Sequence, residues 1–261
     1  MLKSLWHYRA YILSAIHSDL RQRVIRSKIG FFWMLVQPLV MALIYALILS
    51  NILSAKLEGV DSAYAYPVYL MAGIVGWSIF AETLSKSLTM FIDHAQQIQK
   101  LIMPRAVIPI VVIGQTAVTG ILLAAAVTLV IAFIDHPLTL QLFWLPLLVI
   151  LTLMLASSLG LILGLLNVFF RDIGQLIPVL LQIGFWLTPI VYMVSILPQK
   201  YQAWLQYNPM THLVATYQQI FVYGNAPSLT TLGVWAGAIV LFYTLGFLLY
   251  RRVAAEMVEE L

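Results

Sequence analysis

Long stretches of this chain contain no charged residue, and this constrains the fold more than any other feature. The whole stretch from Tyr201 to Tyr250 lacks Asp, Glu, Lys and Arg. Of the 261 residues only 9% are charged and 62% are hydrophobic, whereas a soluble domain carries about 25% charged residues and less than half apolar ones. One globule cannot hide that much apolar surface from water. The sequence therefore predicts an integral membrane protein.

A helix that crosses a membrane needs about 20 mostly apolar residues, and six runs of the chain are long enough. These predicted spans are residues 29–53, 67–90, 106–134, 141–169, 173–193 and 228–250. The stretch 196–223 is interrupted by Asn208-Pro209, and a second break, Gly224-Asn225-Ala226-Pro227, follows it. We expect 196–223 to form one or two re-entrant half-helices that enter the outer membrane surface and return, because irregular backbone at that depth must be buried in protein or line a wet cavity. The predicted fold is all-α with six transmembrane helices, and 251–261 form a tail.

The basic residues predict the orientation of these spans. Twelve Lys and Arg residues lie on one side of the predicted topology and two on the other. The twelve are Lys3, Arg9, Arg21, Arg23, Arg26, Lys28, Lys86, Lys100, Arg105, Arg171, Arg251 and Arg252; the two are Lys56 and Lys200. Loops rich in Lys and Arg stay in the cytoplasm, so we expect both termini and the loop before the third span to be cytoplasmic.

Residues 1–28 are predicted to form an amphipathic helix on the cytoplasmic membrane surface. Apolar side chains recur at helical spacing, while Arg9, His17, Asp19 and Arg23 fall largely elsewhere. The apolar set is Leu5, Tyr8, Ile12, Leu13, Ile16, Leu20 and Val24. The basic cluster that ends this segment either fixes the topology or attracts the phosphate of a lipid headgroup. It consists of Arg21, Arg23, Arg26 and Lys28.

A short polar helix is predicted at 94–102, between the second and third spans. Asp93 is a plausible N-cap residue, and Pro104 and Pro109 stiffen the exit from the helix. Its small apolar face consists of Ile98, Leu101 and Ile102. The segment is either an ordinary loop helix or a rigid knob that fits a cleft on a partner protein.

Several kinds of chemistry find no support in the sequence. It contains no Gly-x-x-x-x-Gly-Lys-[Ser/Thr] motif for ATP, no His-Glu-x-x-His motif for zinc and no Gly-x-Ser-x-Gly elbow. It also contains no cysteine. We therefore expect a non-enzymatic chain with no catalytic residue, no metal and no cofactor of its own. Nothing in it indicates nucleic-acid binding.

Glu82 is the one acidic residue well inside a predicted span. Lys86 follows four residues later, in the order that favours an ion pair on a helix. An ion pair near the cytoplasmic end of the second span is one interpretation. The other is a polar point on a transport path or at a helix contact, because ion-driven carriers place ionisable groups inside the membrane.

Five segments resemble the permease subunits of ABC exporters for polysaccharides, in the type-2 ABC permease family. They are RVIRSKIGFFWMLVQPLV (23–40), KLIMPRAVIP (100–109), NVFFRDIGQ (167–175), WLTPIVY (186–192) and YNPMTHLV (207–214). Ile29 stands where the family usually has Leu, and Met103 where an aromatic residue is common. The order and spacing of the five segments carry the resemblance, since each alone is weak.

The resemblance implies a specific assembly in the bacterial inner membrane. A second copy of the chain would pair with it, and two copies of a soluble ATP-binding subunit, which hold ATP and Mg, would dock on the cytoplasmic side. The cargo would be a polysaccharide linked to polyprenyl pyrophosphate, moved from the cytoplasmic to the periplasmic side. O-antigen export is the expected function, with export of teichoic acid or capsule as the alternative. An ion-driven carrier, a drug or small-lipid exporter and a membrane enzyme acting on lipid-linked sugars are rival hypotheses.

The resemblance also implies roles for individual residues. The polar helix would be the coupling helix, and 196–223 a periplasmic gate. Expected contacts to the ATPase subunit are Asp93, His94, Gln97, Lys100, Arg105, Arg171 and Asp172. The cluster Arg21, Arg23, Arg26 and Lys28 would bind the lipid pyrophosphate.

Aromatic side chains are candidates for the path of the glycan, because the apolar C–H faces of sugars pack on aromatic rings. They are Phe32, Trp33, Tyr45, Trp77, Phe80, Phe185, Trp186 and Tyr192. Trp and Tyr also concentrate at membrane interfaces, so interface anchoring or packing is the alternative for each. Two sets of small residues predict close helix contacts. They are Ala156, Gly160 and Gly164, and Gly233 and Gly237.

Overall fold

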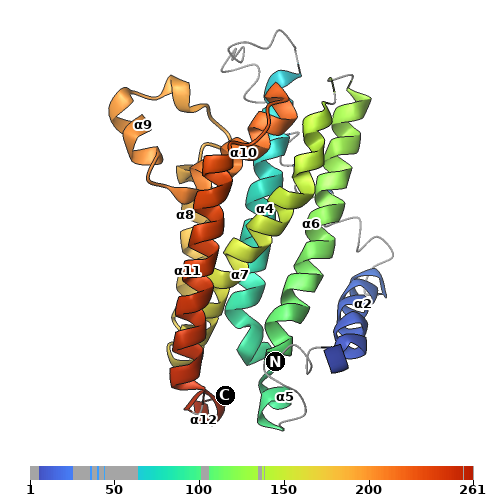
Figure 1. Ribbon diagram of the computed structural model, residues 1–261, viewed down its shortest axis with the longest axis vertical. Coiled ribbons are helices and arrows are strands. Elements are labelled where there is room, and N and C mark those ends of the chain that lie inside the picture. The colour runs from blue at the N-terminus through green and yellow to red at the C-terminus, as the bar shows by residue number, and fades with distance from the viewer. Residues whose placement is uncertain are drawn as a thin grey trace.

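The computed structural model describes residues 6–25, 36, 40, 44, 64–100, 106–134, 137, 139–254 and 256–260. Within these ranges the regular structure is entirely helical (Figure 1). The predicted first span, 29–53, lies outside the described residues apart from three isolated positions. The all-α expectation is confirmed for the part of the chain that is described.

Among the described residues, four helices are long and apolar enough to cross a membrane. They are α4 (Ala65–Asp93), α6 (Val107–Phe133), α7 (Leu145–Phe169), which continues from the short 3-10 helix η1 (Leu140–Trp144), and α11 (Leu229–Val253). They cover the ranges expected for the second, third, fourth and sixth spans. Several of their threonine hydroxyls donate to backbone carbonyl oxygens of the same helix: Thr116 donates to that of Val112 at 3.0 Å and Thr128 to that of Ala124 at 2.7 Å. Such bonds satisfy a polar group in an apolar environment.

Helix α4 is the centre of the bundle and α11 lies at its edge. In the most apolar 18-residue window of each helix, 78% of α4 is buried but only 11% of α11. Helix α4 packs against α6, α7, α8 and α10, whereas α11 packs mainly against α7. Figure 1 shows α4 between its neighbours and α11 along one side. Most of the surface of α11 is therefore free to meet lipid or another chain.

Small residues bring α7 close to α4, as predicted. A Cβ atom added to Gly160 would collide with the side chain of Ser87, and one added to Gly164 would lie 2.6 Å from the carbonyl oxygen of Ser87. Ala156 is fully buried. The same prediction is wrong for Gly233 and Gly237, because no atom of the described chain lies within 4 Å of a Cβ built at either position.

The predicted fifth span, 173–193, is shorter in the structure. Helix α8 runs from Ile173 to Leu187 and has 15 residues, which at 1.5 Å per residue is about 22 Å against a membrane core of about 30 Å. The helix ends because Pro189 disfavours helical geometry at the residue before it, and Thr188 is accordingly extended. The residues after α8 continue as irregular backbone.

The predicted half-helices at 196–223 correspond to two helices after a 3-10 turn, η2 (Val194–Ile196). They are α9 (Gln199–Leu205) and α10 (Pro209–Tyr223). Asn208 caps α10 by accepting a hydrogen bond from the amide of Met210 at 3.0 Å. Gly224 ends it with a φ of 61°, a conformation suited to glycine. Helix α10 lies beside α4 while α9 projects from the bundle (Figure 1).

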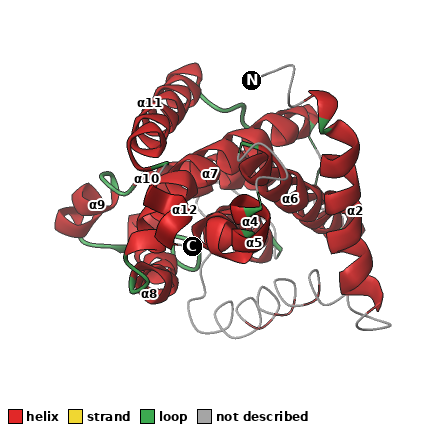
Figure 2. Cartoon of the chain, turned by 90° about the horizontal axis from the view of Figure 1, so that it is seen from below, coloured by secondary structure: helices red, strands yellow, loops and turns green. Residues whose placement is uncertain are grey.

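Three helices gather at the other end of the bundle: α2 (Arg9–Ile25), α5 (Ala95–Gln99) and α12 (Glu256–Glu260). Figure 2 looks along the bundle and shows α4 and α5 nearly end-on but α2 lengthwise. Helix α2 therefore lies across the bundle axis, as a helix in a membrane surface would. Ile12, Ile16 and Leu20, on the predicted apolar stripe, are half-buried. Two residues differ from the prediction, since Leu13 of the stripe is 66% exposed and Asp19, predicted elsewhere, is half-buried. Ile16 packs where Gly114 leaves room on α6, so at that point the stripe faces protein.

Candidate functional site

Helix α5 continues from the end of α4 and is anchored by one apolar side chain. Ile98 is 1% exposed and belongs to a small core cluster separate from the main one. The cluster consists of Met90, Phe91, Ile98, Ile108, Val112, Leu165, Val168 and Met257. The residues Gln96, Gln99 and Lys100 are exposed. The structure thus holds a short polar helix rigidly at one end of the bundle.

The start of α5 differs from the prediction. Asp93 is the last residue of α4 and His94 is the N-cap residue of α5, with no capping hydrogen bond from its side chain. The carboxylate of Asp93 instead accepts a hydrogen bond from the hydroxyl of Thr89 at 2.6 Å. Nδ1 of His94 lies 2.8 Å from the carbonyl oxygen of Met90. The prediction of Asp93 as N-cap is wrong because α4 extends one turn further than expected.

A side-chain hydrogen bond joins helix α2 to α5. The hydroxyl of Tyr11 donates to Oε1 of Gln97 at 3.3 Å. Gln97, half-buried, thereby points toward α2, while its neighbours Gln96 and Gln99 are exposed. The contact joins the amphipathic arm to the polar helix, although the two elements are far apart in the sequence.

A second contact joins α2 to α4. Nζ of Lys86 lies 3.3 Å from a carboxylate oxygen of Glu82 and 3.8 Å from one of Asp19. The predicted Glu82–Lys86 ion pair is confirmed, and it is part of a group of three charges. We call Tyr11, Asp19, Glu82, Lys86 and Gln97 the α2 joint.

Sequence reasoning missed two members of the α2 joint. Asp19 was assigned away from the apolar stripe, but it lies seven residues after Ile12 and three after Ile16, a spacing that puts all three on one helix face. It is also the only acid in α2. An acid on an apolar helix face was the signal that could have found it. No comparable signal identified Tyr11.

The turn after α7 lies near the same end of the bundle. Arg171 and Asp172 are exposed there, and Val168 shares the core cluster of Ile98. Asn167 is 2% exposed, and its side-chain amide donates to the carbonyl oxygen of Leu88 at 3.1 Å. The amide thus ties the end of α7 to α4 and has a structural role. Arg105 lies outside the described residues.

At the opposite end, the irregular segment 188–193 is held by hydrogen bonds from neighbouring helices. The hydroxyl of Tyr66 donates to the carbonyl oxygen of Val191 at 2.6 Å. Tyr69 lies within hydrogen-bond distance of the carbonyl oxygens of Pro189, at 3.1 Å, and Tyr192, at 3.2 Å. Backbone groups that leave a helix inside a membrane protein need such partners.

Helix α10 holds the same segment from the other side. The side-chain amide of Gln218, 4% exposed, donates to the carbonyl oxygen of Pro189 at 3.1 Å. The amide of Asn208 donates to the hydroxyl of Thr188 at 3.1 Å. The segment 188–193 is therefore clamped between α4 and α10 by side chains.

Residues 12–222 of the chain match the family described as ABC-2 type transporter. The chain belongs to the ABC-2 type transporter family. The match takes in α4 to α10, and with them both ends of the bundle described above. The resemblance of the five sequence segments to permeases of this family is thereby confirmed.

Named relatives of this ABC-2 permease are transport proteins. An O-antigen export system permease protein RfbA of Klebsiella pneumoniae is 28% identical over 213 residues, which are 80% of this chain and 79% of the relative. The RfbA protein of Myxococcus xanthus is 24% identical over 264 residues, 100% of this chain and 99% of the relative. The polysialic acid transport protein KpsM of Escherichia coli is 25% identical and covers 89% of each chain.

The permease buries two of the aromatic residues considered for a glycan path. Trp77 and Phe80 belong to the main core cluster, where packing accounts for them. The ring of Phe185 meets that of Trp77 edge-on at 5.9 Å, and Trp186 follows at 5.6 Å from Phe185. Trp186 is 54% exposed, and Tyr192 is half-buried. The residues Phe32, Trp33 and Tyr45 lie outside the described part of the chain.

The basic cluster of the N-terminal arm is only partly described. Arg21 is exposed on α2. Arg23 is on the same helix, while Arg26 and Lys28 fall outside the described residues. The cluster therefore stays a prediction.

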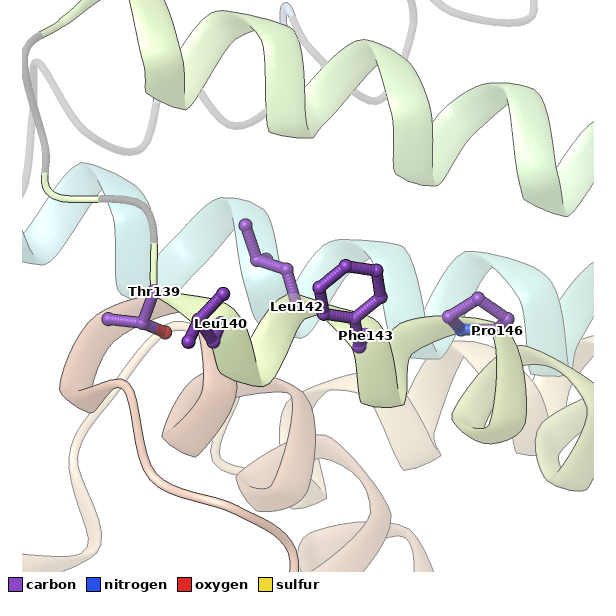
Figure 3. Close-up of a pocket in the computed structure, with 5 residues that line it drawn as sticks. All are labelled: Thr139, Leu140, Leu142, Phe143 and Pro146. Carbon is purple, nitrogen blue, oxygen red and sulfur yellow. The ribbon is translucent and has the colours of Figure 1, made fainter.

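An apolar groove lies beside the start of α7, at the end of the bundle opposite α5. Its volume is about 390 Å³ and it is lined by Thr139, Leu140, Leu142, Phe143 and Pro146 (Figure 3). Leu140 and Phe143 are more than 80% exposed. Thr139 contacts the Gly224 turn that ends α10. Exposed apolar side chains at a span end are typical of a membrane interface.

Proposed function

We propose that this permease is the membrane-spanning subunit of an ATP-driven exporter of lipid-linked polysaccharide of the O-antigen kind. It would move its cargo from the cytoplasmic to the periplasmic side of the bacterial inner membrane. The observation that carries the proposal is α5, a polar helix fixed at the end of the bundle by Ile98 and linked to α2 by Gln97. A permease without an ATP site of its own needs a fixed contact of this kind, through which a separate ATPase subunit can act on it.

The orientation follows from where the charged elements lie. The end of the bundle with α2, α5 and α12 (Figure 1) carries Arg21, Lys100 and Arg252, whereas α9 at the other end carries Lys200. By the positive-inside rule the α5 end is cytoplasmic. Both termini would then be cytoplasmic, and the segment 188–193 with α9 and α10 would face the periplasm.

In the proposed mechanism, α5 docks in a cleft of an ATPase subunit. Two such ATPase subunits act on a pair of permease chains. Each ATPase subunit supplies the ATP and Mg, and no cofactor belongs to this chain. When the ATPase subunits close, they push on Lys100 and on the exposed side of α5. The push reaches α4 through the cluster around Ile98 and reaches α2 through Tyr11. Arg171 and Asp172 would form a second contact. Asp93 and His94, where α4 meets α5, would add to the first contact, and Arg105 is expected to do the same.

The periplasmic gate in this proposal is the segment 188–193 with α9 and α10. Its carbonyl oxygens are held by Tyr66, Tyr69 and Gln218 rather than by a helix. Rotation of these side chains would release the segment without unwinding a helix. Trp186, which is exposed next to it, is the aromatic candidate best placed to meet a sugar chain. The cluster of Arg21, Arg23, Arg26 and Lys28 would engage the lipid pyrophosphate.

Export of capsular polysaccharide is a second candidate, favoured by the relatives named as polysialic acid transport proteins. The two candidates share the ATP-driven mechanism and differ in cargo. Expressing the permease with its ATPase in hosts that make only one of the two lipid-linked polymers distinguishes them. Export of the capsular polymer without export of O-antigen would select the second candidate.

The test of the proposed function is co-purification combined with export in the native host. The tagged permease, extracted in mild detergent, is expected to retain an ATPase subunit in equal amount. Lys100→Glu should weaken this retention and polysaccharide export at least tenfold, because a charge contact becomes repulsive. Lys200→Glu on α9 is the matched control, since both lysines are exposed but lie at opposite ends of the bundle. Equal retention of the ATPase by the two variants would contradict the proposal.

A further inference from the structure

The last turn of α11 borders a cavity that combines apolar and basic side chains. The cavity has a volume of about 520 Å³ and is lined by Leu248, Leu249, Arg251 and Arg252. Helix α11 itself lies at the edge of the bundle and packs mainly against α7 (Figure 1). None of these four lining residues belongs to α5 or to the segment 188–193.

The two arginines have no carboxylate partner among the described residues. In the described part of the chain neither Arg251 nor Arg252 forms an ion pair with an acidic side chain. The guanidinium of Arg251 lies 5.9 Å from the centre of the ring of Phe247, an arrangement that orients it. Both arginines are exposed. Two neighbouring guanidinium groups without a carboxylate form a site suited to phosphate, which they bind in a bidentate manner.

An apolar surface leads along α11 to these arginines. Leu241, Leu245 and Leu248 are 56%, 47% and 55% exposed, and their spacing of four and three residues puts them on one side of the helix. Hydrocarbon chains are the natural neighbours of such a surface on a helix that spans a membrane. The Leu248 end of this side meets the basic end of the cavity.

We propose that the end of α11 binds an anionic phospholipid, with its phosphate between Arg251 and Arg252 and an acyl chain along Leu248 and Leu245. Basic pockets at the ends of membrane helices recognise anionic headgroups in this way. The site rests on α11 spanning a membrane and does not depend on the transport activity. Its place at the edge of the bundle distinguishes it from the proposed pyrophosphate site on the N-terminal arm.

The test uses the purified permease without an ATPase subunit. The protein is freed of lipid in detergent and titrated with phosphatidylglycerol or phosphatidylcholine, and bound lipid is counted by native mass spectrometry. Phosphatidylglycerol is expected to bind at least tenfold more tightly than phosphatidylcholine. The double substitution Arg251→Gln and Arg252→Gln should remove this preference, whereas Lys200→Gln on α9 should keep it.

A variant that keeps both positive charges distinguishes a site with specific geometry from non-specific electrostatic attraction of anionic lipid. Arg251→Lys with Arg252→Lys keeps both charges but loses the bidentate fork, so the preference for phosphatidylglycerol should fall severalfold. An unchanged preference in this variant, or in the Gln double variant, would overturn the proposal. Tighter binding of farnesyl pyrophosphate than of phosphatidylglycerol at the same site would overturn the assignment to a phospholipid. Because no ATPase takes part, failure here leaves the proposed exporter function untouched.

Discussion

The hydroxyl of Tyr11 donates a hydrogen bond to Oε1 of Gln97 at 3.3 Å, across a separation of 86 residues in the sequence. The bond joins helix α2 to helix α5. A displacement of α5 therefore pulls on α2 directly, while Lys86 and Asp19 connect α2 to α4. Helices α2, α5 and α4 are thus connected to one another through side-chain contacts.

Replacing Tyr11 with Phe should weaken the connection between α2 and α5 without disturbing the fold. A neutral hydrogen bond contributes about 0.5–1.5 kcal/mol, so ATP-dependent export should fall by about two- to tenfold. Polysaccharide reaching the cell surface per unit of permease is the measurement. Tyr250→Phe on α11, outside both the α2 joint and the proposed gate, is the control and should leave export unchanged. Wild-type export from the Tyr11 variant would show that the bond plays no part in coupling.

Replacing Gly164 with Ala should destabilise the permease, since the new Cβ would lie 2.6 Å from the backbone oxygen of Ser87. Overpacking costs about 1–3 kcal/mol, visible as a lower midpoint of thermal unfolding in detergent. Gly233→Ala is the matched control, because its Cβ meets nothing within 4 Å in the described chain. Alanine improves helix propensity by about 1 kcal/mol, so this variant should be as stable as wild type or more so. Loss of export by a stable Gly233 variant would indicate a partner on that side of α11.

Replacing Tyr69 with Phe should release the segment 188–193, because the carbonyl oxygen of Tyr192 loses the Tyr69 hydroxyl as donor, while that of Pro189 keeps Gln218. An unsatisfied buried group costs about 1–3 kcal/mol. The chain has no cysteine, so Ile190→Cys, at a fully buried position, gives a clean reporter. A membrane-impermeant maleimide should label it faster, by about fivefold or more, when Tyr69 is Phe. Tyr207→Phe, at an 88% exposed position, should not change the rate. Equal labelling in all three backgrounds would mean that Tyr69 does not hold the gate.

The effect of replacing Glu82 with Gln differs between an ATP-driven exporter and an ion-driven carrier. Lys86 keeps Asp19 as a partner at 3.8 Å, so the positive charge of Lys86 stays compensated and the fold should survive. An exposed or half-exposed ion pair contributes only about 0–1 kcal/mol, and export should stay within about twofold of wild type. A carrier that uses Glu82 as its ion site would instead lose transport and its dependence on the ion gradient. Transport measured with ATP depleted and the ion gradient intact completes the comparison.

Apolar length and helix breakers were enough to predict most of the bundle. The uncharged runs around α4, α6, α7 and α11 locate four helices, and Asn208-Pro209 marks the start of α10. The same rules failed at α8, because they count apolar residues and Ile190 and Val191 are apolar. These residues are buried as irregular backbone instead, and the decisive residue was Pro189.

The candidate site was less accessible to sequence reasoning. The polar helix stood out because it interrupts the apolar pattern. The attachment of this helix to α2 could not be predicted, since a hydrogen bond such as that of Tyr11 with Gln97 depends on how two distant helices are placed. Likewise, aromatic residues such as Trp77 and Phe80 look alike in sequence whether they line a path or fill a core. In this structure both belong to the main core cluster.

Helix α8 stops about 8 Å short of a full crossing, and a stretch fastened by tyrosine, glutamine and asparagine side chains follows it. A continuous helix resists bending along its whole length, so it either tilts as a rod or stays in place. A helix that ends early and continues as irregular backbone, held by side-chain hydrogen bonds, can change direction at its end while it stays packed against α4. Within the described part of the chain, the end of α8 is therefore a place where the bundle can change shape while the contact of α8 with α4 is kept.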